Sequence, residues 1–198
     1  MNNYKHPAHR EIKDAMKEGI GHIFLRNLYN HSNSLIFFER TPSYRLCYRT
    51  IEEYPITRPN GTDRTGKKCC STKFIDFIYL VEPDHSSIYN NACFSIAVEI
   101  KNSKSDLKNA PHQFNDYYGV TDFSMLAVPN YLLRDAKRIV DGIPWVGIFS
   151  YETGEIIKIP SRMPVSDGTR IMMLRRVVFC LNQEIKKEVI LFSREVEA

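Results

Sequence analysis

The chain has 198 residues, of which 43% are hydrophobic and 25% are charged. This length supports one full-sized hydrophobic core, and the composition is that of an ordinary globular domain, so disordered and collagen-like classes are excluded. The 27 basic and 23 acidic residues give a net charge of +4, which is compatible with a polyanionic partner but does not require one. No uncharged apolar stretch approaches the ~18–20 residues that span a bilayer, so we expect no membrane partner.

The N-terminal residues and the cysteines both point to the cytoplasm. The first residues, MNNYKHPAHREIK, are polar and offer no apolar segment of a signal peptide. The five cysteines have no Cys-x-x-Cys spacing, and two of them, Cys69 and Cys70, are adjacent, which disfavours a tetrahedral zinc site. We therefore expect a cytoplasmic protein whose thiols are reduced and mostly buried.

The N-terminal third is expected to form a helix and two strands. Apolar residues at helical spacing predict a helix over residues 7–30. Residues 34–40 and 45–54 are rich in β-branched and aromatic side chains, which indicates two strands. The segment 55–73 carries proline, glycine and Asn-Gly signals and predicts a loop or a hairpin tip.

The rest of the chain alternates strands and helices. Dense apolar runs at 73–81 and 93–101 are typical of buried central strands. A helix is expected within 106–118, with Pro111 in its first turn and Gly119 at its end. The remaining elements are expected in this order: a strand at 123–129, a hairpin of strands at 145–151 and 155–160, and a helix from about residue 169. This order indicates a single domain of class α/β or α+β.

Two carboxylates and a lysine interrupt the central strands. Asp76 lies within an apolar run suited to burial, where an uncompensated charge would cost several kcal/mol. In the next strand Glu99 and Lys101 project to the same side, roughly 6.6 Å apart along the strand. If the two strands are neighbours, these groups converge. Two acidic groups with a backbone oxygen suit Mg²⁺, and the lysine could then orient or activate a water.

Acidic-x-Lys triplets are common, and the chain has five. Residues two apart on a helix do not face each other, and only Glu99 and Lys101 lie on an expected buried strand. The competing interpretation is a Glu–Lys pair on a solvated face of the sheet, with Asp76 at the end of its strand.

These residues resemble the PD-(D/E)XK nuclease superfamily. Asp76 is followed by Glu99-Ile100-Lys101, and the stretch VEIKNSKSDL…HQFNDYYGVTDFSMLAVP (98–129) is most similar to the MmcB-like group of bacterial DNA-repair nucleases. The resemblance covers roughly residues 73–180. The sequence departs from the named motif in having Ile75 in place of the proline before the first aspartate.

The resemblance implies an α/β fold with a restriction-endonuclease-like core, in which helices flank a central mixed β-sheet, as one nuclease-like domain over residues 1–198. It implies that Asp76, Glu99 and the Ile100 carbonyl ligate Mg²⁺ or Mn²⁺, and that Lys101 positions the attacking water for phosphodiester hydrolysis. A third carboxylate from the first helix, Glu11 or Glu18, is an option that a solvated helix face explains equally well.

Gln113 and Tyr117 are four residues apart on the helix after the second central strand, hence on one face. They resemble the Gln-x-x-x-Tyr pair of some nucleases in the superfamily, which makes Gln113 a candidate catalytic residue and Tyr117 a candidate nucleic-acid contact. A buried tyrosine beside an exposed glutamine is the competing interpretation.

Basic residues supply the expected nucleic-acid contacts. Segment 55–73 is rich in lysine and arginine and directly precedes the Asp76 strand, so it is well placed to contact a phosphate backbone. The candidate contacts are Arg58, Arg64, Lys67 and Lys68 in this segment and Lys104 after the Glu99 strand.

The sequence therefore predicts a metal-dependent nuclease that acts on DNA in repair, restriction or phage metabolism. The runner-up is a nucleic-acid-binding or assembly protein that keeps the nuclease fold without turnover. A homodimer is one option for its assembly. A small-molecule enzyme is disfavoured, because the sequence has neither a glycine-rich phosphate loop nor a nucleophile elbow.

Overall fold

The computed structural model describes residues 9–31, 46–62, 68–83, 94–166, 168–169, 171–173 and 175. The chain divides into two compact units between Met163 and Pro164, and each is considered by itself. The second unit contains the predicted C-terminal helix, whose described positions are helical. The strand expected at 34–40 lies outside the described residues. Among the described helices, none combines the length and apolar character that a bilayer crossing requires.

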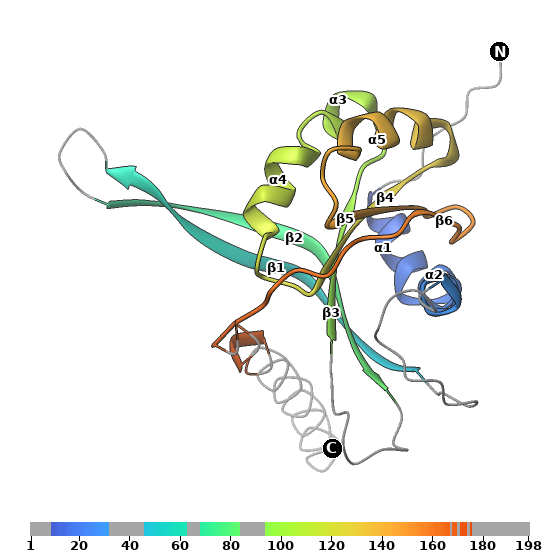
Figure 1. The fold of residues 1–198 in the computed structure, drawn as a ribbon, viewed down its shortest axis with the longest axis horizontal. Helices are drawn as coiled ribbons and strands as arrows, with labels where there is room; N and C mark the ends of the chain where they lie inside the picture. The colour runs from blue at the N-terminus through green and yellow to red at the C-terminus, as the bar shows by residue number, and fades with distance from the viewer. Residues whose placement is uncertain are drawn as a thin grey trace, which may run out of the picture. The chain divides into compact units, whose positions relative to one another are not determined.

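Within the described residues, the first unit is built on a six-stranded mixed sheet with the strand order β1-β2-β3-β4-β5-β6 (Figure 1). β1, β2 and β3 form an antiparallel meander, β4 and β5 continue parallel to β3, and β6 returns antiparallel to β5. The strands are β1 (Leu46–Thr62), β2 (Lys68–Pro83), β3 (Phe94–Ile100), β4 (Phe123–Val128), β5 (Val146–Ser150) and β6 (Ile156–Lys158). The expected α/β class with a central mixed sheet flanked by helices is confirmed.

Helices cover both faces of this sheet (Figure 1). Alternate residues of the central strands belong to one apolar cluster with α1 and α2, while α4 and α5 contact β4 and β5 from the other side. Every residue of β4 is buried, as expected for a strand covered on both faces. The helices are α1 (His9–Lys17), α2 (Gly19–His31), α3 (Lys104–Leu107), α4 (Ala110–Tyr117) and α5 (Leu133–Val140), with a 3₁₀ turn η2 (Asn130–Leu132) before α5.

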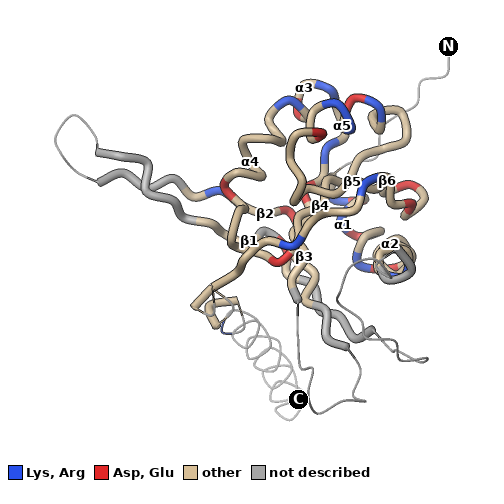
Figure 2. The backbone as a smooth tube through the Cα atoms, viewed as in Figure 1, with Lys and Arg blue, Asp and Glu red and all other residues tan. Residues whose placement is uncertain are grey.

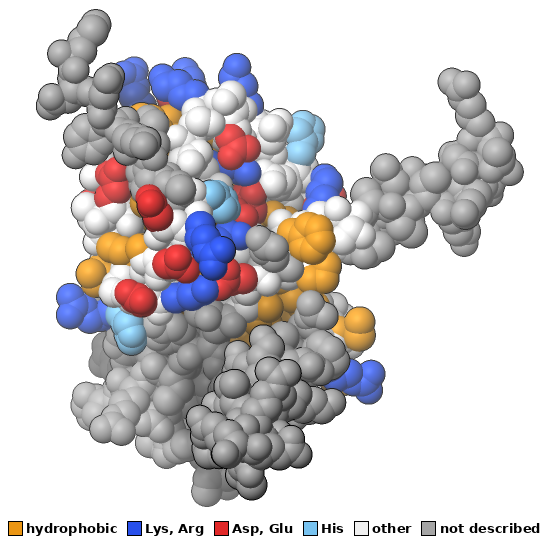
Figure 3. All heavy atoms as spheres, turned by 180° about the vertical axis from the view of Figure 1, so that it is seen from behind, with side chains coloured by type: hydrophobic (Ala, Val, Ile, Leu, Met, Phe, Trp, Pro, Cys, Tyr) orange, Lys and Arg blue, Asp and Glu red, His pale blue; other side chains and the backbone are white. Residues whose placement is uncertain are grey.

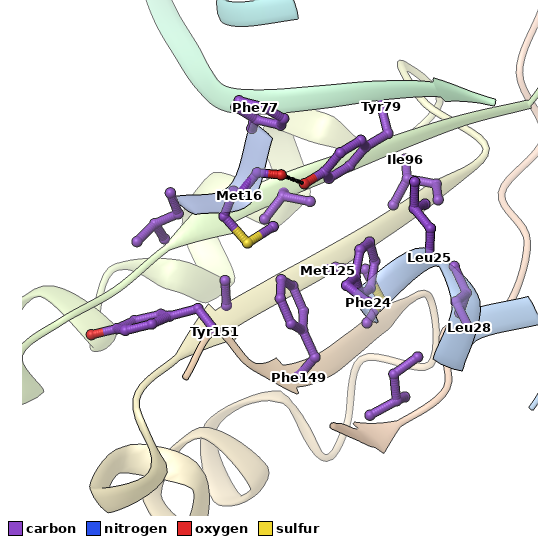
Figure 4. Packing of buried hydrophobic residues seen from close by; sticks show 14 of the residues in the cluster. Met16, Phe24, Leu25, Leu28, Phe77, Tyr79, Ile96, Met125, Phe149 and Tyr151 are labelled. Carbon is purple, nitrogen blue, oxygen red and sulfur yellow. Dashed lines mark hydrogen bonds between the residues drawn. The ribbon is translucent and has the colours of Figure 1, made fainter. Parts of the chain in front are cut away.

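The helix predicted at 7–30 forms as two helices, α1 and α2, that share one apolar stripe. The Met16 carbonyl lies beside the break between the two helices, and the hydroxyl of the buried Tyr79 donates a 2.6 Å hydrogen bond to it (Figure 4). Phe24 stacks on Phe149 of β5 with a centroid separation of 4.3 Å. The Tyr79 hydrogen bond fixes α1 against β2, which is the strand that carries Asp76, and the Phe24 stack fixes α2 against β5.

Of the two options expected over 55–73, a loop or a hairpin tip, the loop is wrong for most of this segment, because it belongs to a hairpin whose strands run further than expected. β1 continues to Thr62 and β2 starts at Lys68, and the two strands pair throughout, apart from a register irregularity near Pro59. Because β3 pairs with β2 only from Phe77 onward, the β1–β2 hairpin extends beyond the sheet (Figure 1). We call residues 57–62 and 68–72 the arm. The prolines that suggested a loop are tolerated because β1 is an edge strand among the strands that the structure describes.

A buried aspartate that sequence reasoning overlooked joins the starts of two central strands. Asp122, which is 1% exposed, accepts hydrogen bonds from the backbone N–H and the hydroxyl of Ser95, and its own N–H donates to that hydroxyl. Arg162 adds a two-pronged ion pair at 3.0 and 3.1 Å. The neighbouring strands β3 and β4 are thereby fixed relative to each other at the end opposite to Glu99.

Gly154 at the β5–β6 turn gives a direct test of this packing. It has a positive φ of 71°, and a Cβ there would meet the Ile23 side chain at 2.6 Å. Gly154→Ala should therefore destabilise the protein by at least about 1–2 kcal/mol, the cost of a left-handed backbone for an L-residue. Urea unfolding measures the change. Gly142→Ala is the matched control, because a Cβ there meets nothing within 4 Å; an equal loss of stability in both variants would contradict the packing.

Candidate active site

Asp76 and Glu99 lie next to each other where β2 and β3 separate. The antiparallel pairing of these strands stops at Phe77 and Val98. Asp76 and Glu99 are therefore the next residues on adjacent strands, and directly opposed residues point to the same face. The Asp76 carboxylate also reaches the end of β3, where its Oδ2 accepts a 2.9 Å hydrogen bond from the backbone N–H of Ile100.

Glu99 is 2% exposed and is surrounded by hydrogen-bond donors. Its Oε1 accepts from Lys101 Nζ at 2.8 Å and from Gln113 Nε2 at 2.7 Å. Its Oε2 accepts a short hydrogen bond from the Tyr117 hydroxyl. Gln113 and Tyr117 thus act together from one face of α4, as their four-residue spacing suggests. This arrangement overturns the interpretation of a Glu–Lys pair on a solvated face.

Lys101 follows β3 directly and is 5% exposed. Its backbone N–H donates to Ala127 on β4, which continues the parallel ladder and fixes the residue. Its ammonium group lies between Glu99 and Asp106, the latter at 3.3 Å. Burial alone would lower the pKa of Lys101, but these two carboxylates outweigh burial and raise it. Lys101 is therefore a positively charged donor at neutral pH, not a base.

The first helix brings two basic groups to Asp76. His9 Nε2 lies 3.0 Å and Lys13 Nζ lies 3.6 Å from Asp76 Oδ1. The residues expected from this helix, Glu11 and Glu18, are exposed instead. The four-residue spacing of His9 and Lys13 was the signal that could have identified them, since it places both side chains on one helix face.

The buried position of Glu99 disfavours a negative charge on both the Glu99 and the Asp76 carboxyl groups. Burial, and after it the charge of Asp76, raises the pKa of the Glu99 carboxyl above its ordinary value, against the opposing effects of Lys101 and Tyr117. The same burial and the nearby Glu99 raise the pKa of the Tyr117 phenol, so that it remains a hydrogen-bond donor. A cation shared by the two carboxylates would relieve the repulsion between them.

The donor set fits a hard divalent cation. Mg²⁺ takes one or two carboxylates and completes its coordination with water and substrate oxygens. Gln113 Oε1, next to Glu99, is a buried acceptor that has no hydrogen-bond partner among the described residues. Among the described residues, no three His, Cys, Asp or Glu side chains lie close enough together to hold a metal ion. Asp76 and Glu99 are therefore the two side chains that could ligate the ion.

The expected nucleic-acid contacts are dispersed. Arg58 lies on β1 opposite Ser71, and Lys68 begins β2, so both belong to the arm and not to a loop. Arg64 and Lys67 lie outside the described residues. The structure corrects the expectation for Tyr117: its side chain is fully buried and serves Glu99, which leaves no surface for a nucleic acid.

The remaining candidate contact, Lys104, lies on a surface where charges are mixed. Lysine and arginine positions occur along α3 and α5 with acidic positions among them (Figure 2). The Lys104 ammonium is exposed and forms a 3.0 Å ion pair with Asp135. The face drawn in Figure 3 likewise intersperses acidic and basic side chains among its described residues.

Comparison with known proteins identifies no family. No protein-family model matches the chain, and no curated protein matches it. A solved structure of a protein of unknown function from Silicibacter pomeroyi is similar over 85% of this chain and 90% of that chain, with 13% sequence identity and a TM-score of 0.44.

The raised pKa of Glu99 predicts a specific pH dependence of stability. Between the unfolded value near 4.5 and the raised folded value, the folded protein binds more protons than the unfolded chain. The stability contributed by Glu99 therefore falls as the pH rises through this window. In urea unfolding from acidic to neutral pH, wild type should lose stability relative to Glu99→Gln. Glu155→Gln, at an exposed position, controls for loss of a carboxylate; the opposite slope would contradict the assignment.

Proposed function

We propose that the protein is a Mg²⁺- or Mn²⁺-dependent nuclease that hydrolyses phosphodiester bonds in DNA. The observation that carries this proposal is the meeting of Asp76, Glu99 and a charged, buried Lys101 at the adjoining ends of two central strands. These are the positions at which the sequence resembles the PD-(D/E)XK nuclease superfamily. The central mixed sheet between helix layers is compatible with that resemblance.

The bound metal ion would neutralise phosphate charge and supply a nucleophile near neutral pH. Asp76 and Glu99 would ligate it, together with the Ile100 carbonyl. Gln113 and Tyr117 fix the Glu99 carboxylate from α4, so its direction is set before any ligand arrives. Preorganisation of this kind removes the cost of ordering a side chain at the moment of reaction.

Lys101 would position the attacking water. Its ammonium group stays protonated beside Glu99 and Asp106, so it can donate a hydrogen bond to the water oxygen and stabilise negative charge that develops in the transition state. Burial strengthens this interaction, because the surrounding dielectric constant is lower than that of water.

The arm supports DNA as the substrate. Arg58 and Lys68 belong to strands that extend beyond the sheet from the Asp76 position, and the nearby Arg64 and Lys67 add to the positive charge of this segment. A basic hairpin can contact successive phosphates of a duplex without reading its sequence.

The central test is cleavage of labelled DNA and RNA with Mg²⁺ or Mn²⁺. Wild type should cleave DNA, and removal of the metal with a chelator should abolish cleavage. Lys101→Met should lower the rate roughly 10²–10³-fold, the cost typical of removing one donor that stabilises charge developing in the transition state. Lys137→Ala, at an exposed position of α5, is the control and should cleave normally.

DNA binding without cleavage under all metal conditions would instead support the runner-up, a catalytically silent nucleic-acid-binding protein. Cleavage by Lys101→Met at the wild-type rate would remove this lysine from the mechanism while leaving the two carboxylates in place. Cleavage of RNA but not DNA would overturn the substrate assignment.

The arm predicts a change in salt dependence. Neutralising Arg58, Arg64, Lys67 and Lys68 together should weaken binding to all duplex sequences about equally. It should also reduce the log–log salt slope by roughly 0.9 for each duplex phosphate that the arm no longer neutralises. Binding across a salt series measures both effects. Neutralising four exposed residues elsewhere, Arg26, Lys108, Arg134 and Lys137, removes the same net charge and is the control; if both variants match wild type, the DNA path lies elsewhere.

A further inference from the structure

A site made of two metal ligands and Lys101 does not explain why two basic side chains of α1 contact Asp76. Lys13 is 6% exposed, and its ammonium lies 3.6 Å from Asp76 Oδ1. His9, one helical turn earlier, lies 3.0 Å from the same oxygen. Burial of a lysine is costly unless its charge is compensated. We call His9 and Lys13 the α1 pair.

Both oxygens of the Asp76 carboxylate have partners in this arrangement. Oδ2 accepts from the Ile100 N–H, and Oδ1 faces the two basic side chains of the α1 pair. A divalent cation that binds Asp76 through Oδ1 would approach the oxygen that the α1 pair already contacts, and its positive charge would repel the Lys13 ammonium. Metal and α1 pair compete for one oxygen atom.

The net charge of the site changes sign when a divalent cation binds. Without a metal, the three carboxylates of Asp76, Glu99 and Asp106 exceed the two ammonium groups of Lys13 and Lys101 by one negative charge. A divalent cation on the same carboxylates adds two positive charges, so the loaded site attracts an anion. An anionic phosphate that contacts the metal lies within reach of a lysine that was 3.6 Å from a metal-ligating oxygen.

We propose that the α1 pair is a phosphate-binding element that occupies Asp76 until a divalent cation displaces it and then contacts the substrate phosphate. This inference rests on the proposed function, and it assigns phosphate recognition to helix α1 in addition to the arm. The pair thus opposes binding of the metal alone and favours binding of metal and nucleic acid together. A lysine that merely fixes α1 to the sheet would not produce these opposite effects.

The first experiment titrates Mn²⁺ alone into the full-length protein by calorimetry. Lys13→Met keeps the apolar stem and removes the charge, so it should tighten Mn²⁺ binding at least about fivefold, the lower end of typical coupling between two ligands. Lys17→Met is the matched control on the same helix, because Lys17 pairs with Glu52 and Asp14 and not with Asp76. Unchanged or weaker Mn²⁺ binding by Lys13→Met would overturn the inference.

The second experiment measures binding of a labelled phosphorothioate DNA oligonucleotide, which resists hydrolysis, at saturating Mn²⁺. Lys13→Met should bind it roughly tenfold more weakly, as expected for loss of one charge-assisted hydrogen bond. Unchanged or tighter binding would show that Lys13 only blocks the metal, which would overturn the phosphate assignment.

One further variant and one independent readout keep the result interpretable. If Lys13→Met does not fold, His9→Ala should show the same two shifts, with exposed His22→Ala on α2 as its control; absence of either shift would overturn the inference. Neither readout needs turnover. A wild-type protein that cleaves nothing would therefore refute the proposed nuclease while these binding shifts still decide the role of the α1 pair.

Discussion

The burial of the Glu99 carboxylate is the constraint on which the rest of the site depends. A carboxylate that is 2% exposed must be compensated by donors, and three separate side chains provide them. Lys101 comes from the end of the same strand, whereas Gln113 and Tyr117 come from α4. The position of α4 over the sheet therefore depends on the hydrogen bonds that Gln113 and Tyr117 donate to the Glu99 carboxylate. A substitution that removes one of these donors weakens the compensation of the buried charge and costs stability as well as geometry.

Much of this arrangement could be predicted from the sequence, because it depends on the spacing of residues that are close together in the chain. The alternation of β3 puts Glu99 and Lys101 on one face, and the helical period puts Gln113 and Tyr117 on another common face. The apolar runs around Asp76 and Glu99 indicated two central strands, and these strands are indeed neighbours. The mixed sheet with helices on both faces followed from the order of these elements. Local period and hydrophobicity were sufficient at each of these positions.

Other features depend on contacts that local patterns do not contain. His9 reaches Asp76 across 67 residues of sequence, and Asp122 reaches Ser95 across 27. The periodicity of the sequence shows which side chains share a face, as for His9 and Lys13, but it does not show which distant residue they contact. The segment 55–73 was expected to be a loop or a hairpin tip because prolines and glycines usually interrupt strands. It belongs to a hairpin, but its strands extend further than expected. Among the described strands β1 is an edge strand, which needs backbone donors on one side only, so Pro55 and Pro59 remain compatible with pairing to β2.

The same two prolines shape how the molecule meets copies of itself. Pro55 and Pro59 lie four residues apart on β1, which is an edge strand among the described strands, and a proline has no N–H to donate to an incoming strand. Prolines on an edge strand discourage a further strand from pairing with it. Because the hairpin extends beyond the sheet, these prolines would limit strand pairing between the hairpins of different molecules.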